Sequence, residues 1–383
     1  MDSHLKRVIL LLETSREFGR GLLYGIARYA RLHGPWSLYR EPSGLKSSVP
    51  KLAGWNANGI IMRNSLIGKD LLDLRLPTVL VIHGRHRPEE LPALVTDAQS
   101  VALLAGEHLL ARGLRHFAFC GFGDLEWSRE REKNFGSFME ERGFTIHRYS
   151  TRFADHPRSW SAEQSRMKNW IQELPKPIGV MACNDDRGQH VLEVCKALRV
   201  KVPEEVAVIG VDNDPMTCEL GDPPLTSVAL NLEAGGFAAA ELLDRLMNGE
   251  RMAGQEIVVT ATHVVQRQST NLLAVDDRGV ADGIRFIRQN ARRRIRVDDV
   301  VAHIGIGRRS VEARFRKTIH RSIQEEIRRV RVELISQLLM ETEMSIAEIT
   351  DHFSFTDVEH ISRYFKKEKG MGMKEFRRIM RRN

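Results

Sequence analysis

The sequence lacks the features that would mark a secreted, metal-binding or membrane protein. Its 383 residues contain only four cysteines, which are widely spaced and form no CxxC motif: Cys120, Cys183, Cys195 and Cys218. This spacing favours neither a disulfide framework nor a zinc site, so we expect no metal and no cofactor. No apolar run approaches the roughly 20 residues that a membrane-spanning helix needs, and the first apolar stretch is interrupted at Glu13. We therefore expect a cytoplasmic protein without membrane contacts.

Motifs of common catalytic sites are also missing. The sequence has no GxSxG, no P-loop, no GxGxxG that opens a helix and no HExxH. An enzyme remains an alternative, because some side chains could form acid–base pairs: Asp185, Asp186, His83, His86 and His190. Only composition supports that alternative, so we expect no catalytic residues and no enzyme.

A surplus of positive charge is confined to one end of the chain. Residues 281–383 contain 24 Lys and Arg against 15 Asp and Glu, whereas residues 1–280 contain 34 against 35. The net charge of +8 therefore comes entirely from the C-terminal quarter. Such a segment can bind a phosphate backbone by releasing counterions, although an idle basic face would have the same composition.

Short apolar runs alternate with helical patterns through the first 270 residues. The runs that predict strands are residues 8–12, 59–62, 78–82, 117–120, 178–182 and 206–211. Strands that are apolar throughout and are separated by helices predict parallel sheets covered on both faces. Ligands of such folds bind at the carboxyl ends of the strands, where polar side chains stand at residues 13–16, 184–187 and 212–214.

The pattern changes after residue 270. Residues 271–284 are predicted as a linker between an α/β domain over residues 1–270 and a helical domain over residues 285–383. Three capping boxes of the form Ser/Thr-x-x-Glu predict helix starts in the second domain, at Ser322 with Glu325, Ser345 with Glu348, and Thr356 with Glu359.

The helical domain contains the same pattern twice. In residues 297–317 a short apolar helix leads through a glycine turn to a second helix, which turns Val311 and Phe315 inward and basic residues outward. Residues 346–368 repeat the pattern, and one long helix over residues 322–340 would hold the two copies at a fixed separation. Two helix-turn-helix units in register predict DNA binding, with a plain helical bundle as the alternative.

A longer motif runs through both copies. It comprises Gly305-Ile306-Gly307, Arg314-Phe315, Arg331, Leu338-Leu339, Ser345-Ile346-x-x-Ile349, and Phe355 to Phe365-Lys366-Lys367. With this motif, residues 285–383 resemble the AraC-type DNA-binding domain of the arabinose-operon regulator. The resemblance implies that DNA is bound by Arg308, Arg309, Glu312, Ala313 and Lys317 on the first reading helix, and by Glu359, His360, Arg363 and Lys366 on the second. Arg309 and Arg363 are the best base readers, because a guanidinium can bind guanine O6 and N7 bidentately.

Three positions depart from the pattern of that family. Gly307 stands where the family has serine, Ser354 where it has glycine, and Met373 where it has proline. A serine in a turn that usually requires glycine predicts a strained or shifted turn in the second copy.

A second set of motifs runs through residues 6–270. It comprises Thr96-Asp97, Arg131-x-x-Asn134-Phe135, Ala182-Cys183-Asn184-Asp185, Ile209-Gly210-Val211-Asp212-Asn213 and Pro223-Pro224-Leu225-Thr226. These motifs resemble the sugar-sensing core of lactose-repressor-type regulators, which is similar to periplasmic sugar-binding proteins. The resemblance implies two lobes of parallel sheet, joined by crossover strands, with an effector bound between them.

The same resemblance implies a set of effector-binding residues. They are Arg131, Asn184 and Asp212, with Asp97, Asp185 and Thr14 nearby. Carboxylates accept hydrogen bonds from sugar hydroxyls, a guanidinium donates to them, and an aromatic face stacks on the ring. The side chains available for stacking are Phe18, Trp127 and Trp160. Asn134 and Ala98 depart from the family pattern, which has glycine and asparagine there.

The order of the two domains is itself informative. The usual sugar repressor places its DNA-binding helices first, whereas here the sensor comes first. This order resembles the xylose-operon regulator family, as do the motifs Trp127-x-x-Glu130-Arg131-Glu132 and His190-x-Leu192-x-Val194-Cys195.

We therefore expect a sequence-specific DNA-binding transcriptional regulator of sugar metabolism, controlled by a monosaccharide. Xylose is the expected effector, and a different pentose or hexose is the alternative. A cytoplasmic sugar-processing enzyme and a sugar carrier for a transporter are further alternatives, and the double DNA-reading pattern disfavours the carrier. Expected partners are a double-stranded DNA operator, the sugar, a second copy in a homodimer, and RNA polymerase.

Overall fold

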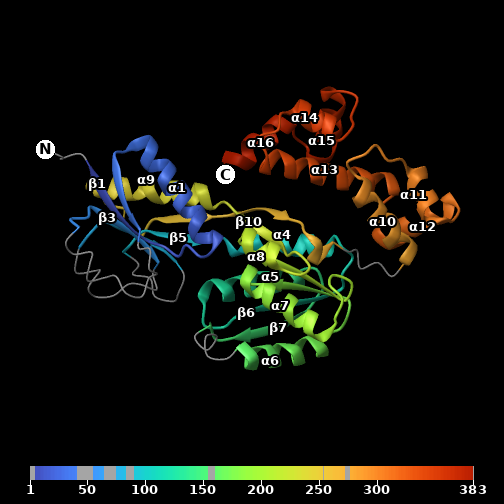
Figure 1. Ribbon diagram of the computed structural model, residues 1–383, viewed down its shortest axis with the longest axis horizontal. Helices are drawn as coiled ribbons and strands as arrows, with labels where there is room; N and C mark the ends of the chain where they lie inside the picture. The colour runs from blue at the N-terminus through green and yellow to red at the C-terminus, as the bar shows by residue number, and fades with distance from the viewer. Residues whose placement is uncertain are drawn as a thin grey trace. The chain divides into compact units, whose positions relative to one another are not determined.

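The structure is a computed structural model that describes residues 5–40, 55–63, 75–82, 90–153, 160–252, 254–271 and 277–382. The chain divides into two compact units (Figure 1). One unit comprises residues 1–108 and 116–270 and is called the sensor unit, after the function that the sequence predicts for it. The other comprises residues 109–115 and 271–383 and is called the DNA-reading unit for the same reason.

The first sheet of the sensor unit has six parallel strands in the order β11-β5-β4-β3-β1-β2. The strands are β1 (Lys6–Leu11), β2 (Trp36–Arg40), β3 (Gly59–Arg63), β4 (Thr78–Val81), β5 (Ala93–Thr96) and β11 (Glu256–Val259). The helices that follow β1, β5 and β10 are α1 (Glu17–His33), α4 (Ala98–Leu110) and α9 (Leu232–Met247). Helices α1 and α9 pack backbone to backbone, since a Cβ atom at Gly25 would lie 2.0 Å from the carbonyl oxygen of Glu233. Only glycine permits so close an approach.

The second sheet has the order β12-β10-β9-β8-β6-β7, and only β12 is antiparallel to its neighbour. Its strands are β6 (His116–Phe122), β7 (Ile146–Thr151), β8 (Ile178–Ala182), β9 (Val206–Val211), β10 (Thr226–Leu230) and β12 (Ala261–Val265). The accompanying helices are α5 (Glu126–Glu140), α6 (Trp160–Glu173), α7 (Asp185–Leu198) and α8 (Pro215–Leu220). The chain passes between the sheets after β5, after β10 and after β11, so the predicted two-lobed fold with parallel sheets is confirmed.

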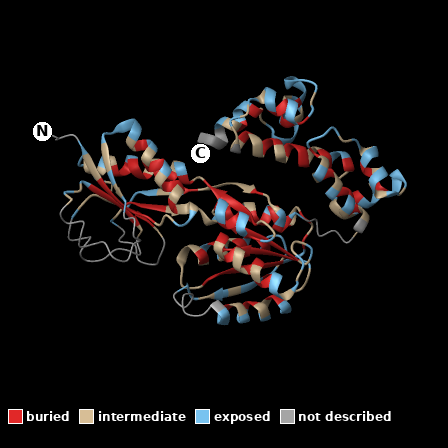
Figure 2. Cartoon of the chain, viewed as in Figure 1, coloured by how far each residue is buried: buried red, intermediate tan, exposed pale blue. Residues whose placement is uncertain are grey.

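The central strands of both sheets are buried, as Figure 2 shows in red. All six apolar runs in the sequence form strands of these sheets. The shorter or more polar strands β2, β5, β7, β10, β11 and β12 were not predicted, because their sequences do not stand out from the neighbouring loops.

The DNA-reading unit is helical and has two hydrophobic cores. Its helices are α10 (Arg278–Asn290), α11 (Val297–Ile304), α12 (Arg308–Ile319), α13 (Ile323–Glu341), α14 (Ile346–His352), α15 (Val358–Lys369) and α16 (Met373–Arg382). One core joins α10, α11 and α12 to the first half of α13, and the other joins α14, α15 and α16 to its second half. The predicted pair of helix-turn-helix units, linked by one long helix, is therefore present.

Helix α10 corrects the predicted extent of the linker. The helix starts at Arg278, inside the predicted linker 271–284, because the Asp277 side chain accepts hydrogen bonds from its first amides. Its apolar residues Val280, Ile284 and Ile287 recur at helical spacing and are buried in the first core. Residues 272–276 lie outside the described residues.

Two of the three predicted capping boxes are confirmed. Ser322 with Glu325 starts α13, and Ser345 with Glu348 starts α14. The third prediction, Thr356 with Glu359, is wrong by one residue. The N-cap of α15 is Asp357, whose carboxylate accepts from the backbone N–H of His360 at 2.6 Å. A carboxylate at this position also suits the positive end of the helix dipole.

The family departures at Ser354 and Met373 differ in their consequences. Ser354 adopts a φ of 52°, in the left-handed region where the family has glycine, so the predicted strain is present. Met373 is the first residue of α16 and is buried in the second core. The first amide of a helix has no intrahelical partner, so methionine serves there as well as proline.

Candidate effector site and DNA-binding surface

The second lobe brings the three main predicted effector residues together. Arg131 on α5 is buried, donates to the carbonyl oxygen of Cys183 at 2.5 Å, and pairs with the Asp212 carboxylate at 3.4 Å. Asn184 follows Cys183 and caps α7 by accepting from the backbone N–H of Arg187 at 3.1 Å. The Arg131 guanidinium also lies over the Trp127 ring, 5.1 Å from its centroid. A forked donor, a carboxylate, an amide and an aromatic face are thus gathered at the carboxyl ends of β8 and β9.

Asp212 has an unusual backbone and a raised pKa. Its φ is 100°, and the next residue, Asn213, has a φ of 53°. The turn is held by hydrogen bonds from the Asp212 N–H to the Val228 carbonyl and from the Asn213 N–H to the Ser227 hydroxyl. Burial raises the pKa of Asp212 to about 6, although the charge of Arg131 acts in the opposite direction. Left-handed residues held in this way are often found at functional sites.

Asp185 supports the lobe rather than offering a carboxylate to a ligand. One of its oxygens accepts from the Ser227 hydroxyl at 2.5 Å, and the other accepts from the backbone N–H of Asp214 at 2.7 Å. The side chain is buried, and burial together with the charge of Asp212 raises its pKa well above the ordinary value. The structure therefore places Asp185 beneath the predicted site, where it fixes the loop between β9 and α8.

The first lobe contributes residues that lie at the ends of its strands. Thr14 follows β1, and its hydroxyl accepts from Arg40 at 3.5 Å. Asp97 follows β5 and accepts from the backbone N–H of Gln99, as a cap of α4 does. Phe18 is half-buried in the first turn of α1. The side chain of Trp160, the remaining stacking candidate, lies outside the described residues.

Sequence reasoning missed one charged residue of the first lobe. Arg63 ends β3, is largely buried, and lies 3.9 Å from the Glu13 carboxylate. Burial lowers its pKa, and the charges of Glu13 and Asp212 partly oppose that shift. The charge of Arg63 thus interacts with a carboxylate from each lobe. A single arginine after an apolar strand is too common a pattern to have indicated this position.

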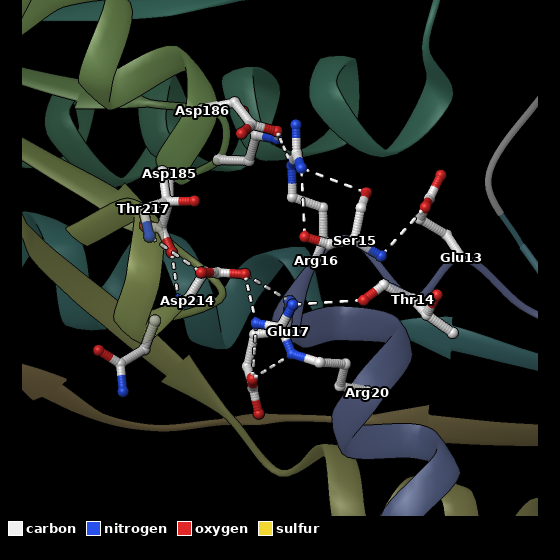
Figure 3. A network of polar contacts seen from close by, with 12 residues as sticks. Glu13, Thr14, Ser15, Arg16, Glu17, Arg20, Asp185, Asp186, Asp214 and Thr217 are labelled. Carbon is white, nitrogen blue, oxygen red and sulfur yellow. Dashed lines mark hydrogen bonds and ion pairs between the residues drawn. The ribbon is translucent and has the colours of Figure 1, made fainter. Parts of the chain in front are cut away.

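Helix α1 of the first lobe meets α7 and α8 of the second through a network of polar contacts (Figure 3). Arg16 donates to the Asp186 carboxylate at 2.6 Å. Asp214 accepts from Arg20 at 2.7 Å and from the backbone N–H of Glu17 at 2.7 Å. Burial alone would raise the pKa of Asp214, but its hydrogen bonds from Thr217, Arg20 and Glu17 hold it below the ordinary value. This buried carboxylate therefore serves the first turns of two helices that belong to different lobes.

In the DNA-reading unit the predicted contact residues lie on the outer faces of α12 and α15. Arg308, Arg309, Ala313, Lys317, Glu359, His360, Arg363 and Lys366 are exposed, and Glu312 is half-buried. The opposite faces bury Val311 and Phe315 on α12, and Ile361 and Phe365 on α15. Arg308 pairs with Asp298 at 2.9 Å and with Glu312 at 3.3 Å, so its charge is partly neutralised within the first helix-turn-helix unit.

One buried arginine connects the two helix-turn-helix units. Arg331, in the middle of α13, donates to the carbonyl oxygens of Ala291 at 3.0 Å and Phe353 at 2.7 Å, and also to that of Arg293. Ala291 and Arg293 precede α11, whereas Phe353 ends α14, so the same guanidinium holds both units. Burial lowers the pKa of Arg331. The sequence showed this residue only as part of a motif, because the backbone acceptors of a side chain leave no sequence signal.

Other site types find little support in the described part of the chain. No group of three His, Cys, Asp or Glu residues there could hold a metal ion, and no described helix is long and apolar enough to cross a membrane. The four cysteines are buried and free, and burial raises the pKa of each thiol. Of the residues considered for acid–base chemistry, His83 and His86 lie outside the described residues, and Asp185 is engaged as described above.

Comparisons with known proteins agree with both units. Residues 107–270 match the model of a periplasmic binding protein-like domain, and residues 300–379 match that of a helix-turn-helix domain. The chain is 31% identical to the xylose operon regulatory protein of Escherichia coli K12 over 97% of both chains. It is 28% identical to the protein of the same name from Haemophilus influenzae, over 98% of this chain and 99% of the relative.

A solved structure, that of the xylose-binding transcription activator XylR, covers 99% of both chains with a TM-score of 0.64 and 29% identity. A two-lobed sensor joined to a double helix-turn-helix unit defines a transcription regulator that carries its own ligand-sensing domain. The chain belongs to the family of xylose operon regulatory proteins.

Proposed function

We propose that this regulator is controlled by xylose bound between the lobes of its sensor unit. The observation that carries this proposal is the arrangement of Arg131, on α5, against Asn184 and Asp212 at adjacent strand ends of the second lobe. Neighbouring hydroxyls of a pentose can accept from the guanidinium and donate to the carboxylate at the same time. The relatives that span the whole chain are named for xylose, which favours this sugar over another pentose or a hexose.

The first lobe would complete this site from the opposite side. Arg63 and Glu13 are proposed to meet the sugar there, because both stand at strand ends and the charge of Arg63 interacts with Asp212 of the other lobe. Thr14 and Phe18 follow β1, as Glu13 does, and in the second lobe the Arg131 guanidinium lies over the Trp127 ring. Asp97 and Asp185 would act indirectly, as a helix cap and as a support of the β9 loop.

A thermal-shift panel tests the effector. The full chain is titrated with xylose, arabinose, ribose and glucose, because a ligand at about 100 times its Kd stabilises the folded state by roughly 2.7 kcal/mol. We expect xylose to raise the melting temperature most, Arg131→Met to abolish the shift, and Lys133→Met, an exposed control on the same helix, to keep it. A larger shift with another sugar would change the effector, and no shift with any sugar would remove the proposal. NMR spectra of the same samples show whether the sugar is chemically converted. An unconverted sugar would show that the protein senses it and does not turn it over.

For DNA, we propose that Arg309 and Arg363 read bases while Lys317 and Lys366 contact the backbone. All four are exposed on the outer faces of α12 and α15. Replacing a base-reading arginine with alanine should cost roughly 1 to 3 kcal/mol and relax preference at one base position, whereas Lys317→Ala should weaken binding to all sequences alike. Affinities for a library of single-base variants of a selected site measure both effects. A uniform loss for Arg309→Ala would show that this residue contacts only the backbone.

The two units are proposed to communicate in a homodimer that acts in the cytoplasm and contacts RNA polymerase. Sugar binding would close the lobes, and closure would change the affinity of the dimer for operator repeats. The contacts of Asp214 and Asp186 with α1 support such a movement, because opening the lobes would break them. Coupling of this kind is reciprocal, so operator DNA must shift sugar affinity by the same factor.

A further inference from the structure

A basic hollow of about 650 Å³ lies between the two helix-turn-helix units. Its lining comes from the segment before α11, the start of α12, the first half of α13, and α15 with the turn before it. Seven of the lining side chains are cationic, and no Asp or Glu is among the described residues that line it. Besides Arg331, the cations are Arg294, Arg296, Arg308, Arg328, Arg363 and Lys367.

Most of this charge is not neutralised. Arg308 and Arg328 each pair with a carboxylate, Arg328 with Glu368 at 3.2 Å. Arg294 and Lys367 are exposed and have no ion pair with any residue that the structure describes. Cations held close together without carboxylates repel one another, and that repulsion is relieved when an anion enters. The charge of the basic hollow therefore points to an anionic ligand.

The basic hollow opens on the face that reads DNA. Three of its lining residues, Arg308, His360 and Arg363, belong to the predicted contact residues of α12 and α15. A duplex that places both helices in its major groove must carry its backbone across the space between them. That space is the basic hollow, and Arg331 fixes its width by binding carbonyl oxygens on both sides.

We propose that the basic hollow binds phosphodiester groups of the DNA duplex. These groups belong to the segment between the two half-sites, which are the stretches of base pairs read by α12 and by α15. Arg294, Arg296 and Arg328 would be backbone contacts outside the two reading helices, and Lys367 would be a further backbone contact on α15. Pockets of about 300 to 1,000 Å³ also hold small ligands, but those pockets contain only a few polar groups, whereas seven cations line the basic hollow. This inference rests on DNA binding by the unit and is independent of the effector.

The salt dependence of DNA binding tests the assignment. The full chain is titrated against a labelled duplex that it has itself selected from a random pool, at several salt concentrations between 50 and 200 mM. Each lost phosphate contact lowers the slope of log affinity against log salt by about 0.9. Arg294→Ala and Lys367→Ala should each lower the slope by this amount, and should weaken a non-specific duplex by the same factor. Lys374→Ala, an exposed lysine of α16 outside the basic hollow, should leave the slope unchanged.

A second arm locates the contact and identifies its source. Neutral methylphosphonate linkages between the half-sites should weaken binding of the wild type but not further weaken Arg294→Ala. If Lys374→Ala and Lys367→Ala lowered the slope equally, the overall positive charge of the unit would explain the salt dependence. That result would overturn the proposal. The proposal would also be overturned if Arg294→Ala left the salt slope unchanged but abolished a stabilisation of the wild-type protein by millimolar inorganic phosphate. The basic hollow would then bind a small free anion. All three substitutions replace exposed side chains, and melting temperatures check that each variant is folded.

Discussion

The candidate effector site and the basic hollow differ in how their charges are paired. In the effector site and the network beside it, charges face opposite charges, as Arg131 faces Asp212 and Arg20 faces Asp214. In the basic hollow, buried Arg331 is held by carbonyl oxygens, and exposed Arg294 and Lys367 have no ion pair with a described residue. Paired charges offer local donors and acceptors with little net field, which suits a neutral sugar. Unpaired cations create a field, which suits a polyanion.

The comparison predicts a large difference in salt dependence. A protein with six to ten phosphate contacts loses about a thousandfold or more in DNA affinity between 50 and 200 mM salt. Sugar affinity should change less than about twofold over the same range, because pairs of buried charges are only weakly screened. Parallel titrations of DNA and xylose measure both. A steep salt dependence of sugar binding would contradict the view that the effector site acts through paired charges with little net field.

Removing Arg331 should have the next largest effect. Arg331→Met leaves three carbonyl oxygens without their donor, two of them buried, and each buried acceptor left unsatisfied costs about 1 to 3 kcal/mol. We expect the free energy of unfolding of the DNA-reading unit to fall by roughly 3 kcal/mol in urea titrations. Arg285→Met, an exposed control on α10, should change it by less than about 0.5 kcal/mol.

A variant of Arg331 also tests its positioning role. The conservative variant Arg331→Lys should keep more of the stability than Arg331→Met. It should lose the simultaneous hydrogen bonds to both helix-turn-helix units, because an ammonium lacks the fork of a guanidinium. Its DNA affinity should then depend less on the number of base pairs between the half-sites than that of the wild type. If both proteins penalise an inserted base pair equally, Arg331 only stabilises the fold.

The charge of Asp212 makes the sensor sensitive to pH. Its pKa of about 6 lies above the ordinary value, so the folded protein holds this proton more tightly than the unfolded chain and loses stability as pH rises through 6. Sugar binding that needs the carboxylate should show the opposite trend and weaken up to about tenfold per pH unit below pH 6. Calorimetry from pH 5 to pH 8 measures this, and Asp212→Asn should bind weakly with no such dependence. A flat profile for the wild type would exclude Asp212 as an ionised acceptor.

Much of this charge pattern could be predicted from the sequence, but its pairing could not. The apolar strands predicted that Asn184 and Asp212 stand at strand ends, and the duplicated helical motif predicted that Arg309 and Arg363 lie on helix faces. Arg131 was predicted only from the family resemblance. The partners of Asp185 and Asp214 come from distant segments, so no spacing indicated them. Arg63 was missed because a single arginine after an apolar strand is too common a pattern, and Thr356 was preferred to Asp357 as a cap because both fit local capping rules.

The smallest expected effect compares the two helix-turn-helix turns. Gly305 and Ser354 both have left-handed backbones, with φ of 77° and 52°. Ser354→Gly should relieve strain and stabilise the unit by about 1 kcal/mol, whereas Gly305→Ser should destabilise it by a similar amount. No atom lies within 4 Å of a Cβ at Gly305, so backbone strain alone is measured there. Equal and opposite shifts in urea midpoint would confirm that the turns differ only in residue type.

Calorimetry can measure whether a sugar in the sensor unit controls DNA binding. Xylose is titrated into the full chain alone and into the full chain saturated with its selected operator duplex. If the sugar controls DNA binding, the two sugar affinities should differ about 5-fold to 150-fold, the usual range of allosteric coupling, and DNA affinity should change by the same factor when sugar is added first. Identical sugar affinities with and without the duplex would contradict this control of DNA binding.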